Sequence, residues 1–260
     1  MNIVVCVKQV PDTTEIKIDP ITNTLIREGV DSIINPFDLY AIEEAVKIKE
    51  SFGGTVTAIS MGPPQAETAL REAVSLGVDN IILLSDRKFA GADTWATSLT
   101  LSAAIRKIGK VDLIFFGQQA IDGDTAQVGP GVAAHLDIEQ VCFVSKIVSI
   151  ENENVVLERL MEDGYDILRT KMPLALSVVK EINSPRLPSL RGKKNAKSVE
   201  LTLWKSDDLA LDEKTIGLNG SPTQVVKIFS PQIQKNGEKY EVSTDESVEI
   251  LYRRLMEIRR

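Results

Sequence analysis

The chain has 260 residues, of which 43% are hydrophobic and 26% charged, with a net charge of -7 and a pI near 5.0. A chain of this length can bury a sizeable core, so we expect one large domain with or without an appendage. The acidic balance argues against a nucleic-acid-binding protein, which needs a basic surface. The sequence shows no apolar run long enough for a transmembrane segment and no signal peptide, so we expect a cytoplasmic protein.

Hydrophobic periodicity predicts strands that alternate with helices over the first half of the chain. Buried strands are predicted at 3–7, 55–60, 80–85 and 111–116, and each is followed by a segment with helical spacing. The helices are expected from 36, over 65–76, over 94–108 and from about 126. This order predicts an α/β fold with a doubly wound parallel sheet. Residues 15–19 and 24–28 predict a hairpin beside that sheet.

The stretch from Val111 to Pro130 is the strongest candidate for a ligand site. Residues 113–116 (LIFF) are typical of a strand buried on both faces, and polar or small residues follow it up to a helix start. A loop between a parallel strand and a helix N-terminus suits phosphate, because the first N–H groups of a helix have no intrahelical partner. We therefore place a nucleotide here, with a plain connection that holds no ligand as the alternative.

The loop departs from known phosphate-binding patterns. Its glycines at 117, 123 and 129 do not form the GxGxxG fingerprint. Asp122 and Asp124 would repel a phosphate, so we expect that they turn away to cap the helix or that one binds ribose hydroxyls. Asn35 stands before Pro36 at a predicted helix start, where it is either an N-cap or a ligand-binding residue.

Short extended runs follow residue 140, at 142–150, 154–160, 165–170 and 174–179, and predict a meander that closes one side of the domain. Residues 183–194 predict a loop. From Arg186 to Lys197 there are five basic residues and no acidic one. This segment is either a solvated linker or a docking surface in which Leu187 or Leu190 projects beside a cationic rim.

The end of the chain predicts an amphipathic helix. Ser243 and Glu246 have the spacing of a capping box. An apolar stripe follows, made of Val248, Leu251, Leu255 and Ile258. Such a stripe with little local core predicts an arm that packs on another chain.

Side chains suited to catalysis or metal binding do not cluster in the sequence. His135 is the only histidine and is expected to be structural. Cys6 and Cys142 lack CxxC spacing and are expected to be buried thiols. The sequence also contains no P-loop motif. From these observations together we predict no catalytic residue and no metal. Redox chemistry would then need a bound cofactor.

Several motifs in order resemble the beta subunit of electron transfer flavoproteins. They are residues 7–12 (VKQVPD), 35–38 (NPFD), 60–63 (SMGP), 117–122 (GQQAID) and 159–173. The resemblance covers nearly the whole chain, including the loop at Leu187 and Pro188 and the terminal arm. One departure is Asp166, where the family signature usually carries Glu or Gln.

The resemblance implies a fold like that of adenine nucleotide alpha hydrolases, with a C-terminal extended arm. It implies a nucleotide- or FAD-binding domain over 1–182, a partner-recognition loop over 183–198 and an arm over 199–260 that packs on an alpha subunit. It places the partner-docking residues at Leu187, Pro188 and Leu190. The implied cofactor-binding residues are Cys6, Asn35, Pro36, Phe37, Asp38, Met61, Gly117, Gln118, Gln119, Ala120, Ile121, Asp122, Gly123, Asp124, Thr125, Ala126, Gln127 and Val128.

Family members differ in the ligand of this pocket. In one branch it holds AMP as a structural ligand, and the only FAD is carried mainly by the alpha subunit, whereas in the electron-bifurcating branch it holds a second FAD. Gly123, Thr125 and Gly129 favour FAD, because they remove side-chain bulk where a flavin diphosphate must approach the backbone.

A bifurcating member is expected to accept a hydride from NADH and to send the two electrons along separate routes. One electron would go to ferredoxin or flavodoxin. The other would pass through the alpha-subunit FAD to a flavin dehydrogenase such as an acyl-CoA dehydrogenase. NADH oxidation is expected only within the flavoprotein complex.

Two other classes of protein remain open. A stand-alone ATP-hydrolysing or adenylating enzyme of the related fold would carry an SGGxD-like loop after its first strand, and residues 8–11 (KQVP) offer none. A subunit with structural AMP, which shuttles electrons between a dehydrogenase and an acceptor without bifurcation, is the closer alternative.

Overall fold

The computed structural model describes residues 1–12, 32–226 and 237–258, which divide into one unit up to residue 226 and a second from 227. The hairpin predicted over 15–28 lies outside the described residues. We describe each unit by itself. None of the helices within the described ranges is long and apolar enough to cross a membrane.

Nine strands of the described residues form one sheet, in the order β11-β5-β4-β1-β6-β10-β7-β8-β9. The pairs from β11 to β7 are parallel, and β8 and β9 continue the sheet as antiparallel strands. A separate antiparallel pair is formed by β2 (Gln9–Pro11) and β3 (Ser32–Ile34). The strands of the large sheet are β1 (Asn2–Cys6), β4 (Thr55–Met61), β5 (Asn80–Leu84), β6 (Leu113–Gly117), β7 (Glu139–Glu151), β8 (Asn154–Met161), β9 (Gly164–Lys171), β10 (Leu174–Val178) and β11 (Leu201–Trp204).

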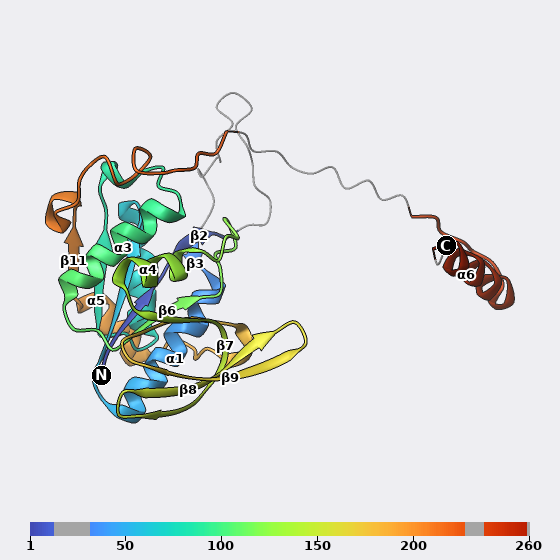
Figure 1. Cartoon of the computed structure of the whole chain (residues 1–260), viewed down its shortest axis with the longest axis horizontal. Coiled ribbons are helices and arrows are strands. Elements are labelled where there is room, and N and C mark those ends of the chain that lie inside the picture. Colours follow the sequence, from blue (N-terminus) through green and yellow to red (C-terminus); the bar gives the residue numbers. More distant parts are fainter. Residues whose placement is uncertain (13–31, 227–236, 259–260) are drawn as a thin grey trace. The chain divides into compact units, whose positions relative to one another are not determined.

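Helices cover both faces of the parallel part of this sheet. The helices of the first unit are α1 (Pro36–Phe52), α2 (Glu67–Ser75), α3 (Thr94–Ile108), α4 (Val128–Leu136) and α5 (Leu190–Ser198). Short 3-10 helices are η1 (Pro64–Ala66), η2 (Arg87–Phe89), η3 (Lys180–Ile182) and η4 (Ser206–Leu209). Helices α3 and α4 lie side by side (Figure 1).

Each face of the sheet has its own hydrophobic core. In β1, Ile3 and Val5 join the core that packs under α1 and α2, whereas Val4 and Cys6 join the core under α3 and α4. Strands buried on both faces need apolar residues at every position, which explains the unbroken apolar runs of the sequence. The predicted doubly wound α/β fold is therefore confirmed.

The structure differs from the sequence-based prediction in the second half of the first unit. The segment 174–179 was expected in a meander, but β10 crosses over to lie between β6 and β7 and pairs with both in parallel. Within the large sheet of the described residues, the antiparallel pairs are β7 with β8 and β8 with β9. Residues 201–204, which lie in the predicted arm, form β11 at the edge beside β5. Non-local pairing, which periodicity does not report, decides both placements.

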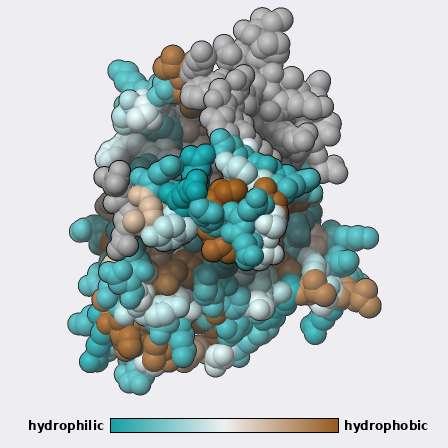
Figure 2. Space-filling view, turned by 90° about the vertical axis from the view of Figure 1, so that its right-hand side faces the viewer, coloured by the Kyte–Doolittle hydropathy of each residue, from teal (hydrophilic) through white to brown (hydrophobic). Residues whose placement is uncertain are grey.

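The second unit contains α6 (Thr244–Ile258). The predicted capping box is confirmed, because the Ser243 amide donates to Glu246 Oε2 at 3.3 Å and the Glu246 amide donates to Ser243 Oγ at 3.5 Å. Val248, Leu251 and Leu255 of the predicted stripe are exposed. On the face of the molecule drawn in Figure 2, hydrophilic residues predominate and hydrophobic residues gather in small separate groups.

The close contact between α3 and α4 predicts that a methyl group added at Gly131 destabilises the fold. A Cβ on Gly131 of α4 would lie 2.8 Å from Ser98 Cβ of α3, and Ser98 is buried. We expect Gly131→Ala to lower the free energy of unfolding by about 1–3 kcal/mol, because overpacking outweighs the gain in helix propensity. Urea denaturation of the full chain measures this change.

Gly123→Ala is the control, since its Cβ would meet only Lys8 Nζ, at 3.9 Å. We expect this variant to change the free energy of unfolding by no more than about 0.5 kcal/mol. Equal losses in the two variants would contradict the packing argument.

Candidate functional site

The predicted ligand-binding segments meet where the strand order of the sheet reverses. The chain moves from β1 to β4 and β5 on one side, then returns to the other side of β1 at β6. Open parallel sheets bind ligands beyond the carboxyl ends of the strands at such a switch point. Cys6, Met61 and Gly117 end β1, β4 and β6, which are neighbours in the sheet. The structure therefore brings these residues to one edge.

A buried carboxyl group lies between the ends of β1 and β6. Asp38, in the first turn of α1, is 5% exposed, and its Oδ2 accepts a hydrogen bond from the Lys8 amide at 2.7 Å. Its Oδ1 accepts one from Asn35 Nδ2 at 3.0 Å. Gly117 is required here, because a Cβ at that position would lie 2.6 Å from the carbonyl carbon of Phe37 and would also meet Asp38 Oδ1.

The charge state of Asp38 is set by opposing effects. Burial raises the pKa of its carboxyl group from 3.8 to about 7, against the lowering effect of hydrogen bonds from Lys8, Asn35 and Gly117. Desolvation has the larger effect on this pKa, because the charged carboxylate has lost its bound water and its hydrogen-bond donors replace only part of it.

Asn35 connects α1 to the loop that follows β6. Its Nδ2 donates to Gln119 O at 2.8 Å as well as to Asp38, and its Oδ1 accepts from the Ile121 amide at 3.1 Å. Asn35 is the N-cap residue of α1, as predicted, but its side chain makes no capping hydrogen bond to the helix backbone. The amide group is used by the protein itself, and Asn35 therefore positions the loop. Pro36 occupies the first turn of the helix, as its fixed φ favours.

The two aspartates of the loop have partners within the site. Lys8 Nζ pairs with Asp122 Oδ1 at 2.6 Å, and Asp124 Oδ1 accepts a hydrogen bond from Gln119 Nε2. Neither side chain caps α4, which begins after Gln127 without a side-chain cap, so that part of the prediction is wrong. The lysine offsets the repulsion that Asp122 would exert on a phosphate.

The backbone of the loop adopts conformations that non-glycine residues rarely use. Asp124 and Ala126 have φ values of 52° and 53°. Such conformations cost free energy in non-glycine residues and often cluster at functional sites. Turns that combine left-handed and right-handed residues can form anion-binding concavities from their N–H groups. Residues 121–125 are exposed, but the Ile121 amide donates to Asn35 Oδ1 and the Asp124 amide to Ala120 O, so within the described residues only the amides of Asp122, Gly123 and Thr125 in this run are left for a ligand.

The end of the loop is fixed to α3 and β6. Thr94 Oγ1 donates to Gln127 Oε1 at 3.0 Å, and Ser98 Oγ donates to Val128 O at 3.2 Å. Gly129 faces the ring of Phe116, because a Cβ there would lie 3.2 Å from it. Glycine at position 129 therefore allows α4 to pack closely on Phe116 and does not open the backbone to a ligand. Gly123 faces open space apart from Lys8, so its backbone is accessible.

Gln118 and Ala120 complete the predicted set. The side chain of Gln118 donates from Nε2 to Gln119 Oε1 at 3.3 Å, and Ala120 O accepts from the Asp124 amide at 2.9 Å. Sequence reasoning missed Lys8 as a member of the site. Its position directly after β1 was the available signal, because that loop ends beside the loop after β6 in a parallel sheet.

The other reactive side chains are placed as structural groups. Burial raises the pKa of the Cys6 thiol, and nearby Asp38 raises it further, so this thiol stays protonated. Cys142 is only partly buried, contrary to prediction. His135 contacts the Trp95 ring edge-on, at 4.7 Å between ring centroids. The described part of the chain contains no group of three or more His, Cys, Asp or Glu side chains that could hold a metal.

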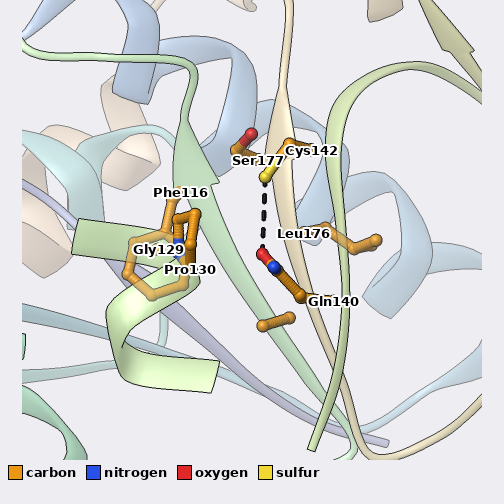
Figure 3. Close-up of a pocket in the computed structure, with 8 residues that line it drawn as sticks. Phe116, Gly129, Pro130, Gln140, Cys142, Leu176 and Ser177 are labelled. Carbon is orange, nitrogen blue, oxygen red and sulfur yellow. Dashed lines mark hydrogen bonds between the residues drawn. The ribbon is translucent and has the colours of Figure 1, made fainter. Parts of the chain in front are cut away.

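A narrow hollow lies beside the start of α4, between β6, β10 and β7 (Figure 3). Cys142 Sγ and Gln140 Oε1 lie 3.4 Å apart in it, but it has no room for a water molecule. Gly129 lines this hollow, but none of the cofactor-binding residues that the family resemblance implies does. The edge above β1 and β6, where the predicted residues gather, remains the candidate ligand site.

The predicted partner-docking residues lie apart from this site. Leu187 and Leu190 are each 89% exposed, and Leu190 begins α5, which the sequence predicted as a loop. Ser189 caps that helix by accepting a hydrogen bond from the Gly192 amide at 2.9 Å. Helix α5 rests on α2.

Comparison with known proteins matches residues 22–209 to the family model described as the electron transfer flavoprotein domain. The chain is 54% identical to an electron transfer flavoprotein subunit beta of Thermoanaerobacterium thermosaccharolyticum, over 98% of each chain. It is 51% identical to the caffeyl-CoA reductase-Etf complex subunit CarD of Acetobacterium woodii, over 92% of this chain and 91% of that one. It is 49% identical to the protein FixA of Azotobacter vinelandii, over 89% and 85%.

The raised pKa of Asp38 predicts a pH dependence of stability. Between about pH 4 and pH 7 the folded chain holds a proton that the unfolded chain has lost, so the free energy of unfolding falls as pH rises through this window. The slope is roughly 1.4 kcal/mol per pH unit. We expect Asp38→Asn to lack this contribution, and urea denaturation of the full chain from pH 5 to pH 8 measures it.

Asp163→Asn is the matched control, because Asp163 is exposed. It should keep the pH dependence of the parent chain. Parallel stability curves for the parent and Asp38→Asn would show that Asp38 does not titrate in this window.

Proposed function

We propose that this chain, which belongs to the electron transfer flavoprotein family and within it to the beta subunits, binds FAD at the edge above β1 and β6. In this proposal it accepts a hydride from NADH and sends electrons singly to ferredoxin or flavodoxin and, through an alpha-subunit FAD, to a flavin dehydrogenase. The observation that carries the proposal is the loop 117–127, held in a strained, donor-presenting conformation at the switch point of the sheet.

The residues at this edge fit the diphosphate of an adenine-containing cofactor. The backbone amides of Gly123, Thr125 and Ala126 and the N-terminus of α4 would bind phosphate oxygens, and the ammonium group of Lys8 beside Gly123 neutralises Asp122. Asn35 and Asp38 hold these donors in place, so their geometry does not depend on the ligand. When bound, FAD would supply the two-electron and one-electron redox chemistry.

The size of the loop residues supports FAD over AMP. Gly123 and Thr125 are exposed and small, so a bulky diphosphate can reach the backbone there. Gly129 does not add to this support, because it packs on Phe116. The second candidate is a non-bifurcating beta subunit with structural AMP, since the same donors suit a single phosphate.

The remaining partners follow from surfaces and relatives. The exposed apolar stripe of α6 supports packing on an alpha subunit. The exposed Leu187 and Leu190 beside basic side chains support docking of a dehydrogenase with an apolar socket and an acidic rim. The Acetobacterium relative is named as part of a complex with caffeyl-CoA reductase, and we extend that class of partner, a reductase or dehydrogenase of CoA esters, to this chain.

Counting cofactors tests the proposal directly. We expect the purified heterodimer with its alpha subunit to release two FAD molecules on denaturation, measured by absorbance and chromatography against protein concentration. One FAD together with AMP would reject FAD binding by this chain and support the second candidate. The absence of any flavin would reject both assignments.

Removing the Asn35 side chain tests the site itself. Asn35→Ala loses the bonds to Gln119 and Ile121, so the loop is no longer fixed in its donor-presenting form. We expect the affinity for the FAD of this subunit to fall at least about tenfold, which corresponds to roughly 1.4 kcal/mol. Flavin retained after dialysis measures this loss.

Asn195→Ala, at an exposed position of α5, is the control and should keep both flavins. The alpha-subunit FAD should remain in the Asn35→Ala variant. Retention of two flavins in that variant, with unchanged affinity, would contradict the assignment of the site.

A further inference from the structure

The segment from Asn183 to Ser198 exposes two leucines while the residues around them are held firmly. Leu187 and Leu190 are each 89% exposed, although burying such side chains is favourable. A flexible loop would let them turn inward. The contacts of their neighbours show why they do not.

Arg186 fastens this segment to the outer face of α1. Its Nε donates to Glu43 Oε2 at 2.7 Å and its Nη1 donates to Glu50 Oε1 at 2.6 Å. Its Nη2 bonds the second oxygen of both carboxylates, at 3.2 and 3.0 Å, and its backbone amide donates to Glu43 Oε2 at 3.1 Å. The Glu43 side chain is only 9% exposed, so this part of the ion pair is shielded from solvent.

The segment has a second anchor on each side of Arg186. Before it, Asn183 Nδ2 donates to Tyr40 O and to Glu44 Oε2, both at 3.0 Å. After it, Gly192 lies against the backbone of α2, because a Cβ there would be 2.9 Å from the Ser75 carbonyl carbon. Arg71 of α2 also donates to Ala196 O at 2.6 Å. Leu187 and Leu190 therefore stand on a backbone held at both ends.

We propose that Arg186 is a positioning residue that holds Leu187 in the conformation required for docking on a flavin dehydrogenase. This inference rests on the proposed function. The partner is a surface with an apolar socket for leucine and a rim of carboxylates, because the segment carries only basic charges from Arg186 to Lys197. A preformed segment loses little conformational entropy on binding, so fixing Leu187 in advance increases affinity without adding a contact.

The ion pairs of Arg186 indicate that this residue positions the segment and does not itself attract the partner. Both carboxylate partners of its guanidinium group belong to α1 of the same chain. Its charge is thus neutralised within the chain, unlike that of Arg191, whose exposed side chain has no ion pair to any residue in the described ranges. Loss of Arg186 should weaken docking through the conformation of the segment, and loss of Arg191 through electrostatic attraction.

The test uses the complete heterodimer with NADH and ferredoxin, and an FAD-containing acyl-CoA dehydrogenase as the electron acceptor. Electron transfer is followed by flavin absorbance as the dehydrogenase concentration is varied, with Arg186→Gln, Arg186→Lys, Glu50→Gln and Leu187→Ala. We expect Arg186→Gln to raise the half-saturating dehydrogenase concentration about tenfold, which corresponds to roughly 1.4 kcal/mol, and to leave the rate at saturation unchanged. Arg186→Lys should restore part of the affinity.

Hydrogen exchange of the amides from 186 to 192 provides a readout on the segment itself. We expect faster exchange in Arg186→Gln, with unchanged flavin content. Glu50→Gln removes only the more exposed of the two ion pairs of Arg186, so it remains informative if Arg186→Gln fails to fold. Arg87→Gln removes the same charge from an exposed position next to β5 and should change neither readout.

Three outcomes decide the proposal. Faster exchange together with weaker docking in Arg186→Gln supports it. The salt dependence of docking should equal that of the parent in Arg186→Gln, whereas in Arg191→Gln it should differ. Unchanged docking in both Arg186→Gln and Glu50→Gln, while Leu187→Ala weakens it, overturns the positioning role and leaves the docking assignment intact. Unchanged docking in Leu187→Ala as well would reject the docking surface of the proposed function.

Discussion

The candidate site depends on one buried carboxyl group. Asp38 accepts hydrogen bonds from the loop after β1 and from Asn35, and it occupies the space that a side chain at 117 would need. Three segments distant in sequence therefore meet at a single polar group inside the protein. A buried group of this kind is favourable only when its donors are all in place, so the three segments must adopt their positions together. The shape of the ligand-binding edge follows from that requirement.

Much of the fold could be predicted from the sequence, because strands that are buried on both faces leave unbroken apolar runs. The runs at 3–7, 55–60, 80–85 and 111–116 all became neighbouring parallel strands. The placement of β10 could not be predicted, since its apolar run would suit a meander or a crossover equally well. Helix α5 was missed because its sequence is mostly polar. Its Ser189 cap and the close approach of Gly192 to α2 define it instead.

Which segments form the candidate site could be predicted from the sequence, but the role of each residue in it could not. The family resemblance is confirmed by the match over residues 22–209, and the chosen residues gather at one edge. The role of Asn35 was not predictable, because its partners Gln119 and Ile121 lie 84 and 86 residues away in sequence. Lys8 was missed for the same reason, as its salt bridge to Asp122 joins two loops that only the parallel pairing of β1 and β6 brings together.

The position of β10 constrains the order in which the sheet is completed during synthesis. Strands β5, β4, β1 and β6 leave the ribosome first, and β7, β8 and β9 follow as a local antiparallel group. Both groups can form from neighbouring segments of the nascent chain, yet the gap between β6 and β7 stays open until residues 174–178 emerge. Strand β10 therefore joins the parallel strands to the antiparallel group, and without it both β6 and β7 would present an unpaired sheet edge.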